Sequence, residues 1–75
     1  MSNHKSGLNL ALKVAILRTR QSQRAIAQAA GIPETRLSQI VNDRVIATTD
    51  ERRALAKVLE QKVASLFDEN ISAHP

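Results

Sequence analysis

The chain has 75 residues and a net charge of +4 with neutral histidines, which is room for one small domain. It contains no cysteine, which excludes disulfide frameworks and thiolate zinc sites, and a single aromatic residue, which argues against a stacking platform for single-stranded nucleic acid. The two histidines, His4 and His74, lie near the ends, where a catalytic or metal site would lack rigid support. We therefore expect no metal, no cofactor and no enzymatic activity.

Residues 1–7 are polar and predict a disordered tail. The stretch LNLALKVAIL, residues 8–17, is too short to span a bilayer and lacks the cleavage pattern of a signal peptide. We expect it to form a buried helix from Leu8 to Thr19 in a cytoplasmic protein, with Leu12 and Ile16 one turn apart on its inner face.

Two short helices are predicted next. Ser22 is a good N-cap for a helix that runs to Ala30, and Gly31 suits the left-handed position that ends a helix. Pro33 is expected to start the second of the two, because the first turn of a helix does not need its missing N–H. The inner face of this second helix is expected to comprise Leu37, Ile40 and Val41.

The remainder of the chain continues the all-helical pattern. Thr48 and Glu51 have the spacing of a capping box, which predicts the start of a fourth helix. Its apolar stripe is Ala54, Leu55, Val58 and Leu59, and a last short helix should hold Val63, Leu66 and Phe67. The prediction is an all-α, five-helix domain over residues 8–69, followed by a tail over 70–75.

Residues 23–42 raise a functional question, because helices joined by so small a turn must cross steeply, as in a helix-turn-helix. Burial of Ile26, Leu37 and Ile40 turns a polar side of the second helix outward. That side carries Glu34, Thr35, Ser38, Gln39 and Asn42. These are hydrogen-bonding side chains of the kinds that contact base edges in the DNA major groove.

The charge is uneven along the chain. Residues 1–49 hold seven basic and two acidic side chains, whereas residues 50–75 hold four basic and five acidic ones. The basic excess therefore lies in the part of the chain that carries the polar helix face, and a polyanion is a natural partner for it. A second interpretation, that the net charge only keeps a small protein soluble, is equally compatible with charge alone.

The order and spacing of these residues resemble the lambda-repressor/Cro-like (XRE-type) helix-turn-helix family. SQRAIAQAAGI is similar to the family's TQ..LA...G(V/I) stretch, RLSQIVN to its (T/R)(I/V)S.(I/L).N stretch, and LAKVLEQKVASLFDE to its closing segment. The matching residues in the motif are Gln23, Ala27, Gly31, Leu37, Ser38 and Ile40. The resemblance covers roughly residues 8–69 and implies a compact five-helix DNA-binding fold.

The resemblance also implies roles for individual residues. Glu34, Thr35, Ser38 and Gln39 match positions at or beside the bases, with Ser38 at the groove wall, while Gln23, Asn42 and Arg44 match positions that contact the DNA backbone. The basic rim formed with Arg20, Arg24 and Arg36 is expected to contact phosphates as well. Glu34 has an alternative role at the helix N-terminus, where an acid interacts favourably with the helix dipole.

Three positions depart from the family pattern. Pro33 stands where Ser or Thr often caps the third helix, which predicts a different helix entry. Asp43 and Glu60 stand where glycine is usual, and this puts the geometry of both helix exits in question.

These observations predict a sequence-specific regulator, a repressor that binds double-stranded DNA as a homodimer on two half-sites and associates with the nucleoid. The alternative is the antitoxin of a toxin–antitoxin pair, which binds a toxin protein and its own promoter. Leu66 and Phe67 are expected in the core or at a dimer interface. The four basic residues after residue 49 are expected on a solvated face; they are Arg52, Arg53, Lys57 and Lys62.

Overall fold

The structure is a computed structural model that describes residues 8–67, and within this range it is all-helical, as the composition predicts. Its helices are α1 (Leu10–Arg18), α2 (Gln23–Ala30), α3 (Glu34–Val41), α4 (Thr49–Leu59) and α5 (Val63–Leu66). The predicted tails, both histidines and the last two residues of the predicted domain lie outside the described residues.

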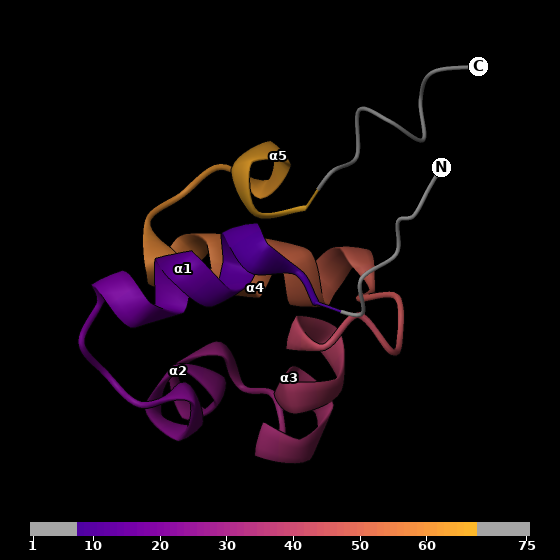
Figure 1. Cartoon of the computed structure of the whole chain (residues 1–75), viewed down its shortest axis with the longest axis horizontal. Coiled ribbons are helices and arrows are strands. Elements are labelled where there is room, and N and C mark those ends of the chain that lie inside the picture. Colours follow the sequence, from indigo (N-terminus) through magenta and orange to yellow (C-terminus); the bar gives the residue numbers. More distant parts are fainter. Residues whose placement is uncertain (1–7, 68–75) are drawn as a thin grey trace.

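The helices pack around one centre. Figure 1 shows α1 and α4 across the middle of the domain, α2 and α3 together on one side and α5 on the other. Helix α2 packs against both α3 and α4, whereas α1 packs against α3 and α5. The two helices that carry the candidate motif are therefore neighbours at one end of the domain.

One large side chain from each helix is completely enclosed in the core. These five are Leu12, Ile26, Leu37, Leu55 and Leu66. The predicted inner face of α3 is confirmed, because Ile40 and Val41 are buried together with Leu37. Ala27 and Ile32 are buried as well, and Phe67 packs half-buried against the same cluster. No polar or charged residue is buried among those described, so apolar packing dominates the stability of the fold.

Helix α1 begins two residues later than predicted, at Leu10 instead of Leu8. The reason is Asn9, whose side-chain oxygen accepts a hydrogen bond from the main-chain N–H of Leu12 at 3.0 Å. Its Nδ2 also donates to the main-chain oxygen of Leu66 at 3.0 Å. Asn9 therefore both caps α1 and joins it to α5, and Leu8 lies outside the helix.

The predicted signals around α2 are confirmed. Ser22 caps the helix by accepting a hydrogen bond from the Ala25 N–H at 3.0 Å, and Gly31 ends it in the left-handed region with φ of 73°. Pro33 was predicted to be the first residue of α3. It is instead the N-cap residue, and its side chain makes no capping hydrogen bond. The proline fixes φ at −58° and so sets the direction in which α3 starts.

The capping box predicted for α4 is present: Glu51 N–H donates to Thr48 Oγ1 at 3.1 Å, and Thr48 N–H donates to Glu51 Oε1 at 2.8 Å. At the two helix ends where the family usually has glycine, a residue other than glycine adopts the left-handed backbone conformation. Asp43 follows α3 with φ of 59°, and Glu60 ends α4 with φ of 56°. The chain thus makes the turns at which glycine is favoured, at some cost in backbone energy.

Candidate functional site

Helix α3 presents a polar face toward solvent and an apolar face toward the core. Glu34, Thr35, Gln39 and Asn42 are exposed and Ser38 is half-buried, whereas Leu37, Ile40 and Val41 are buried. We call the first five residues the polar face of α3. The prediction that Thr35 and Gln39 point away from the core is confirmed.

The side chains of this polar face are largely uncommitted within the domain. Among the described residues, Glu34, Thr35 and Gln39 make no side-chain hydrogen bond or ion pair. Asn42 Nδ2 lies 3.5 Å from Ser38 Oγ, a contact at the outer limit of a hydrogen bond. Their donors and acceptors are therefore available to an external partner.

Several of the predicted phosphate-binding residues are exposed on α2 or on the segments that flank α2 and α3. Arg24 lies in the first turn of α2, Arg44 follows α3, and Arg20 precedes α2 with φ of 64°; all three are exposed, while Gln23 is half-buried. Helices α2 and α3, which these residues belong to or flank, are packed neighbours (Figure 1). The arrangement combines positive charge with uncommitted hydrogen-bonding groups.

Arg36 is engaged differently from the other predicted phosphate contacts. Its Nε donates to Glu51 Oε2 at 2.8 Å and its Nη2 to Glu51 Oε1 at 2.9 Å, which is a bidentate ion pair between α3 and α4. The side chains of Arg36 and Glu51 are only 31% and 19% exposed. Because Nε and Nη2 already donate to Glu51, we set Arg36 apart from the exposed arginines.

This ion pair shifts the pKa of both Arg36 and Glu51. The hydrogen bonds from Arg36 lower the pKa of Glu51, partial burial opposes them, and the Thr48 N–H lowers it further. The hydrogen bond to Glu51 in turn raises the pKa of Arg36. The sequence indicated only a capping role for Glu51, because its partner is 15 residues away and the pairing depends on how α3 and α4 are placed.

Between residues 8 and 67 no three His, Cys, Asp or Glu side chains come together in a way that could hold a metal ion. In the same range no helix combines the length and apolar character needed to cross a membrane.

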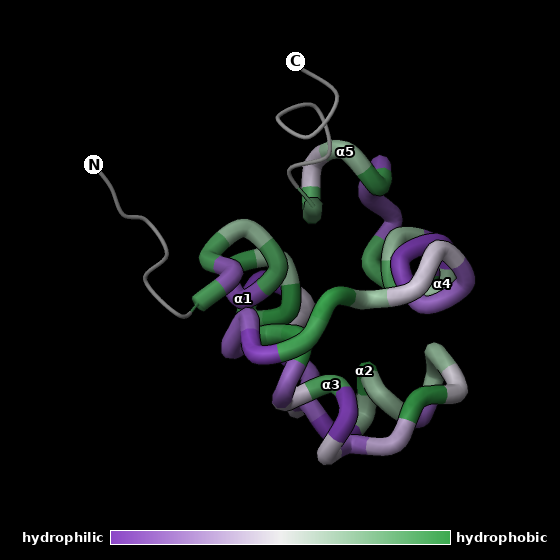
Figure 2. The backbone as a smooth tube through the Cα atoms, turned by 90° about the vertical axis from the view of Figure 1, so that its right-hand side faces the viewer, coloured by the Kyte–Doolittle hydropathy of each residue, from purple (hydrophilic) through white to green (hydrophobic). Residues whose placement is uncertain are grey.

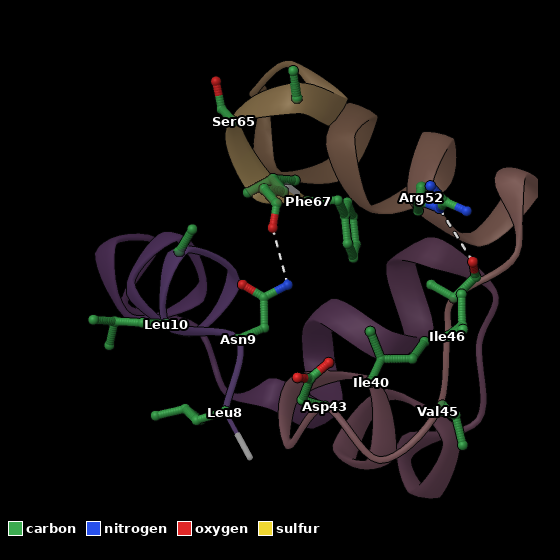
Figure 3. A pocket seen from close by; sticks show the side chains of 14 residues that line it. Leu8, Asn9, Leu10, Ile40, Asp43, Val45, Ile46, Arg52, Ser65 and Phe67 are labelled. Carbon is green, nitrogen blue, oxygen red and sulfur yellow. Dashed lines mark hydrogen bonds between the residues drawn. The ribbon is translucent and has the colours of Figure 1, made fainter. Parts of the chain in front are cut away.

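A separate feature is an open pocket of about 710 Å³ between the start of α1, the α3–α4 connection and α5. Figure 2 shows the hydrophobic α3–α4 connection crossing between α1 and α4. Figure 3 shows the Phe67 ring turned into the hollow and Ile46 on the side of this connection, while the Leu10 side chain points away from the centre. Ile46 is 85% exposed and Leu10 is 62% exposed. No residue of the polar face of α3 lines this pocket, so it forms a second surface.

Arg52 lines this pocket and makes contacts within the domain that the predicted solvated face does not imply. It is half-buried, its Nε donates to the main-chain oxygen of Ala47 at 3.1 Å, and its guanidinium lies 6.0 Å from the centroid of the Phe67 ring. The arginine therefore links the α3–α4 connection to the residue that ends α5.

Comparison with known protein families, curated proteins and solved structures gives no match for this chain.

Proposed function

We propose that this protein is a sequence-specific binder of double-stranded DNA that acts as a transcriptional regulator. In this proposal α2 and α3 form a helix-turn-helix of the lambda-repressor type, and α3 lies in the major groove. The observation that carries the proposal is the polar face of α3, which is solvent-exposed and largely uncommitted within the described domain. The exposed Arg44 follows α3 in the chain, and the exposed Arg24 lies on the neighbouring helix α2. A bound domain would block access to its site, so we propose repression as the mode of control.

The residue types of the polar face suit base recognition. A glutamine such as Gln39 can pair through two hydrogen bonds with adenine N6 and N7, and Thr35 can donate to or accept from several base edges. Glu34 can accept from the cytosine N4 amino group, although an acid beside DNA is otherwise repelled. Ser38 is half-buried next to Asn42 and is better placed at the edge of the groove.

The backbone contacts are assigned to exposed groups around this face. Arg20, Arg24 and Arg44 supply positive charge, and Gln23 lies at the N-terminus of α2, where free main-chain N–H groups favour a phosphate. Asn42 follows α3 and can donate to the backbone from its side-chain amide. We leave Arg36 out of this set because its Nε and Nη2 groups and its charge are already paired with Glu51.

A single recognition helix reads only a few base pairs, so we propose that two copies bind two half-sites related by two-fold symmetry. The pocket beside Ile46 is the surface we assign to the second copy. It offers both a protruding side chain, Ile46, and a hollow lined by Leu10 and Phe67, so the same patch can complement itself across a two-fold axis.

The antitoxin alternative remains the second candidate because exposed aliphatic side chains favour a protein partner of some kind. Leu10 and Leu17 are each 62% exposed and Ile46 is 85% exposed. Sedimentation of the purified chain separates the two ideas. A dimer supports the self-association that we propose, whereas a monomer that stays monomeric on DNA favours a different protein on this surface.

The proposal is tested by the salt dependence of duplex binding. Each arginine that neutralises a phosphate contributes about one unit to the slope of log affinity against log salt. Arg24→Gln and Arg44→Gln should each reduce that slope by about one, whereas Arg53→Gln, an exposed arginine on α4, should leave it unchanged. Binding that is insensitive to salt, or equal slopes for all three variants, contradicts the proposal.

A further inference from the structure

The ion pair between Arg36 and Glu51 connects α3, the candidate recognition helix, to α4. These two helices have few direct packing contacts with each other. Helix α3 packs mainly on α2 and α1, and α4 packs mainly on α2 and α5, with little contact between α3 and α4 themselves. Arg36 spans this separation with two hydrogen bonds to one carboxylate. Its Nη2 also lies 3.4 Å from the main-chain oxygen of Ile46 in the connection between the two helices.

Glu51 is itself fixed in place, which makes it a suitable anchor. Its Oε1 accepts from the Thr48 N–H as part of the capping box, and its main-chain N–H donates to Thr48 Oγ1. One carboxylate therefore serves the N-terminus of α4 and the guanidinium from α3 together. The planar guanidinium meets the carboxylate in a bidentate geometry, which restricts the orientation of Arg36 more than a single contact would.

Helix α3 has no side-chain cap at its N-terminus that would add to its fixation. Pro33 provides no side-chain capping hydrogen bond, unlike the N-cap residues of α2 and α4. Arg36 lies in the first turn of α3, one residue after Thr35, which is exposed. A constraint on Arg36 consequently acts on the part of α3 that carries the first residues of the polar face.

We propose that Arg36 and Glu51 are a positioning pair: the ion pair fixes the orientation of α3 against α4 and thereby aims the polar face of α3 at DNA. This inference rests on the proposed function for its readout on DNA, but its geometric part concerns the free protein. Arg36 acts through Glu51 and does not neutralise a phosphate.

A positioning role and simple charge repulsion predict opposite effects of neutralising Glu51 on the affinity for DNA. Glu51 is an acid, so its neutralisation should strengthen DNA binding if Arg36 contacted a phosphate and Glu51 merely competed for it. If the pair positions α3, the same neutralisation should weaken binding to the preferred sequence. Glu51→Gln is the suitable change because glutamine still serves as the third residue of a capping box.

The first experiment measures duplex affinity for the preferred site and for an unrelated sequence, with wild type, Glu51→Gln, Arg36→Gln and the double variant. Each single variant should reduce the ratio of specific to non-specific affinity by about fivefold or more, and the double variant should be no worse than either single one. The salt slope for the unrelated sequence should be the same for Arg36→Gln and wild type. Asp50→Asn, which removes an exposed acid from the same turn of α4, should leave the ratio unchanged.

Two results would overturn the positioning role. Tighter binding by Glu51→Gln, together with a salt slope about one unit smaller for Arg36→Gln, would assign Arg36 to a phosphate. Additive losses in the double variant would also overturn it, because independent sites add whereas paired residues do not.

A second measurement on the free protein keeps this inference separate from the proposed function. Residual dipolar couplings of backbone amides report the orientation of α3 relative to α4 without any DNA. Glu51→Gln and Arg36→Gln should produce the same change in orientation, and Asp50→Asn should produce none. An unchanged orientation in both variants overturns the inference even if DNA is bound, whereas a wild type that binds no duplex overturns only the proposed function.

Discussion

Asn9 Nδ2 donates a hydrogen bond to the main-chain oxygen of Leu66 at 3.0 Å, across a separation of 57 residues in the chain. The same side chain accepts from the Leu12 N–H, so it caps α1 and holds α5 against it. The N–H of Asn9 also donates to the Val41 oxygen at 2.7 Å, which adds the end of α3 to the same junction. One amide residue thus connects three helices.

Substitutions at Asn9 should therefore separate its two side-chain roles. Asn9→Ser keeps a capping oxygen but loses the bond to Leu66, and we expect it to lower the free energy of unfolding by about 1 kcal/mol. Asn9→Ala loses both and should cost about 2 kcal/mol. Urea unfolding of the two variants measures this order; equal losses would show that the bond to Leu66 contributes nothing.

Glu60 offers a prediction of the opposite sign, because it ends α4 in the left-handed region with φ of 56°. Glycine adopts this conformation without steric cost, so Glu60→Gly should raise the free energy of unfolding by about 0.5–1 kcal/mol. Gly31→Ala is the reciprocal control. No atom lies within 4 Å of an added Cβ at Gly31, so its loss of about 1 kcal/mol would come from φ alone. A destabilised Glu60→Gly protein would contradict the assignment of strain at this position.

The ion pair of Arg36 and Glu51 predicts how stability depends on pH. Folding lowers the pKa of Glu51 below its ordinary value of 4.5, chiefly through the hydrogen bonds from Arg36. A carboxyl whose pKa is lower in the folded state stabilises the fold fully above the unfolded value. This contribution is lost as the pH falls through the lower folded pKa. Wild type should therefore lose stability faster than Glu51→Gln below pH 4.5, as measured by urea unfolding at a series of pH values. Parallel curves for the two proteins across the acidic range would show that Glu51 does not contribute in this way.

The surface assigned to the second copy can be tested at Ile46. This side chain is 85% exposed, so Ile46→Asp should hardly affect the stability of the monomer. At the two-fold interface it would place a charge in an apolar hollow, and the dimer dissociation constant should rise about tenfold or more. Leu17→Asp is the matched control, because Leu17 is also exposed but does not line the pocket. Sedimentation equilibrium that shows equal effects for the two variants would exclude this surface.

Local signals in the sequence predicted the motif region well. Ser22, Gly31 and the pair Thr48 and Glu51 each act through main-chain groups a few residues away, so their roles follow from spacing alone. The inward residues of α3 were likewise set by helical periodicity. Once these are fixed, the exposed position of Thr35 and Gln39 follows.

Features that depend on tertiary placement could not be predicted in the same way. Arg36 looks like any other surface arginine in the sequence, and only the folded chain brings it to Glu51. Asn9 was missed as a cap because the apolar run that surrounds it suggested an earlier helix start. The left-handed geometry of Glu60 could not be predicted either: the family resemblance places Glu60 where glycine is usual, but it does not say which conformation a glutamate adopts there.

The central claim, that the polar face of α3 reads a DNA sequence, is tested most directly by selecting bound duplexes from a random library. Wild type, Gln39→Ala and Arg53→Gln are carried through in parallel. We predict that wild type enriches two related half-sites about 34 Å apart, and that Gln39→Ala loses the preference at one position in each half-site. Arg53→Gln should enrich the wild-type motif. No enriched motif with wild type, or an unchanged motif with Gln39→Ala, would contradict the account.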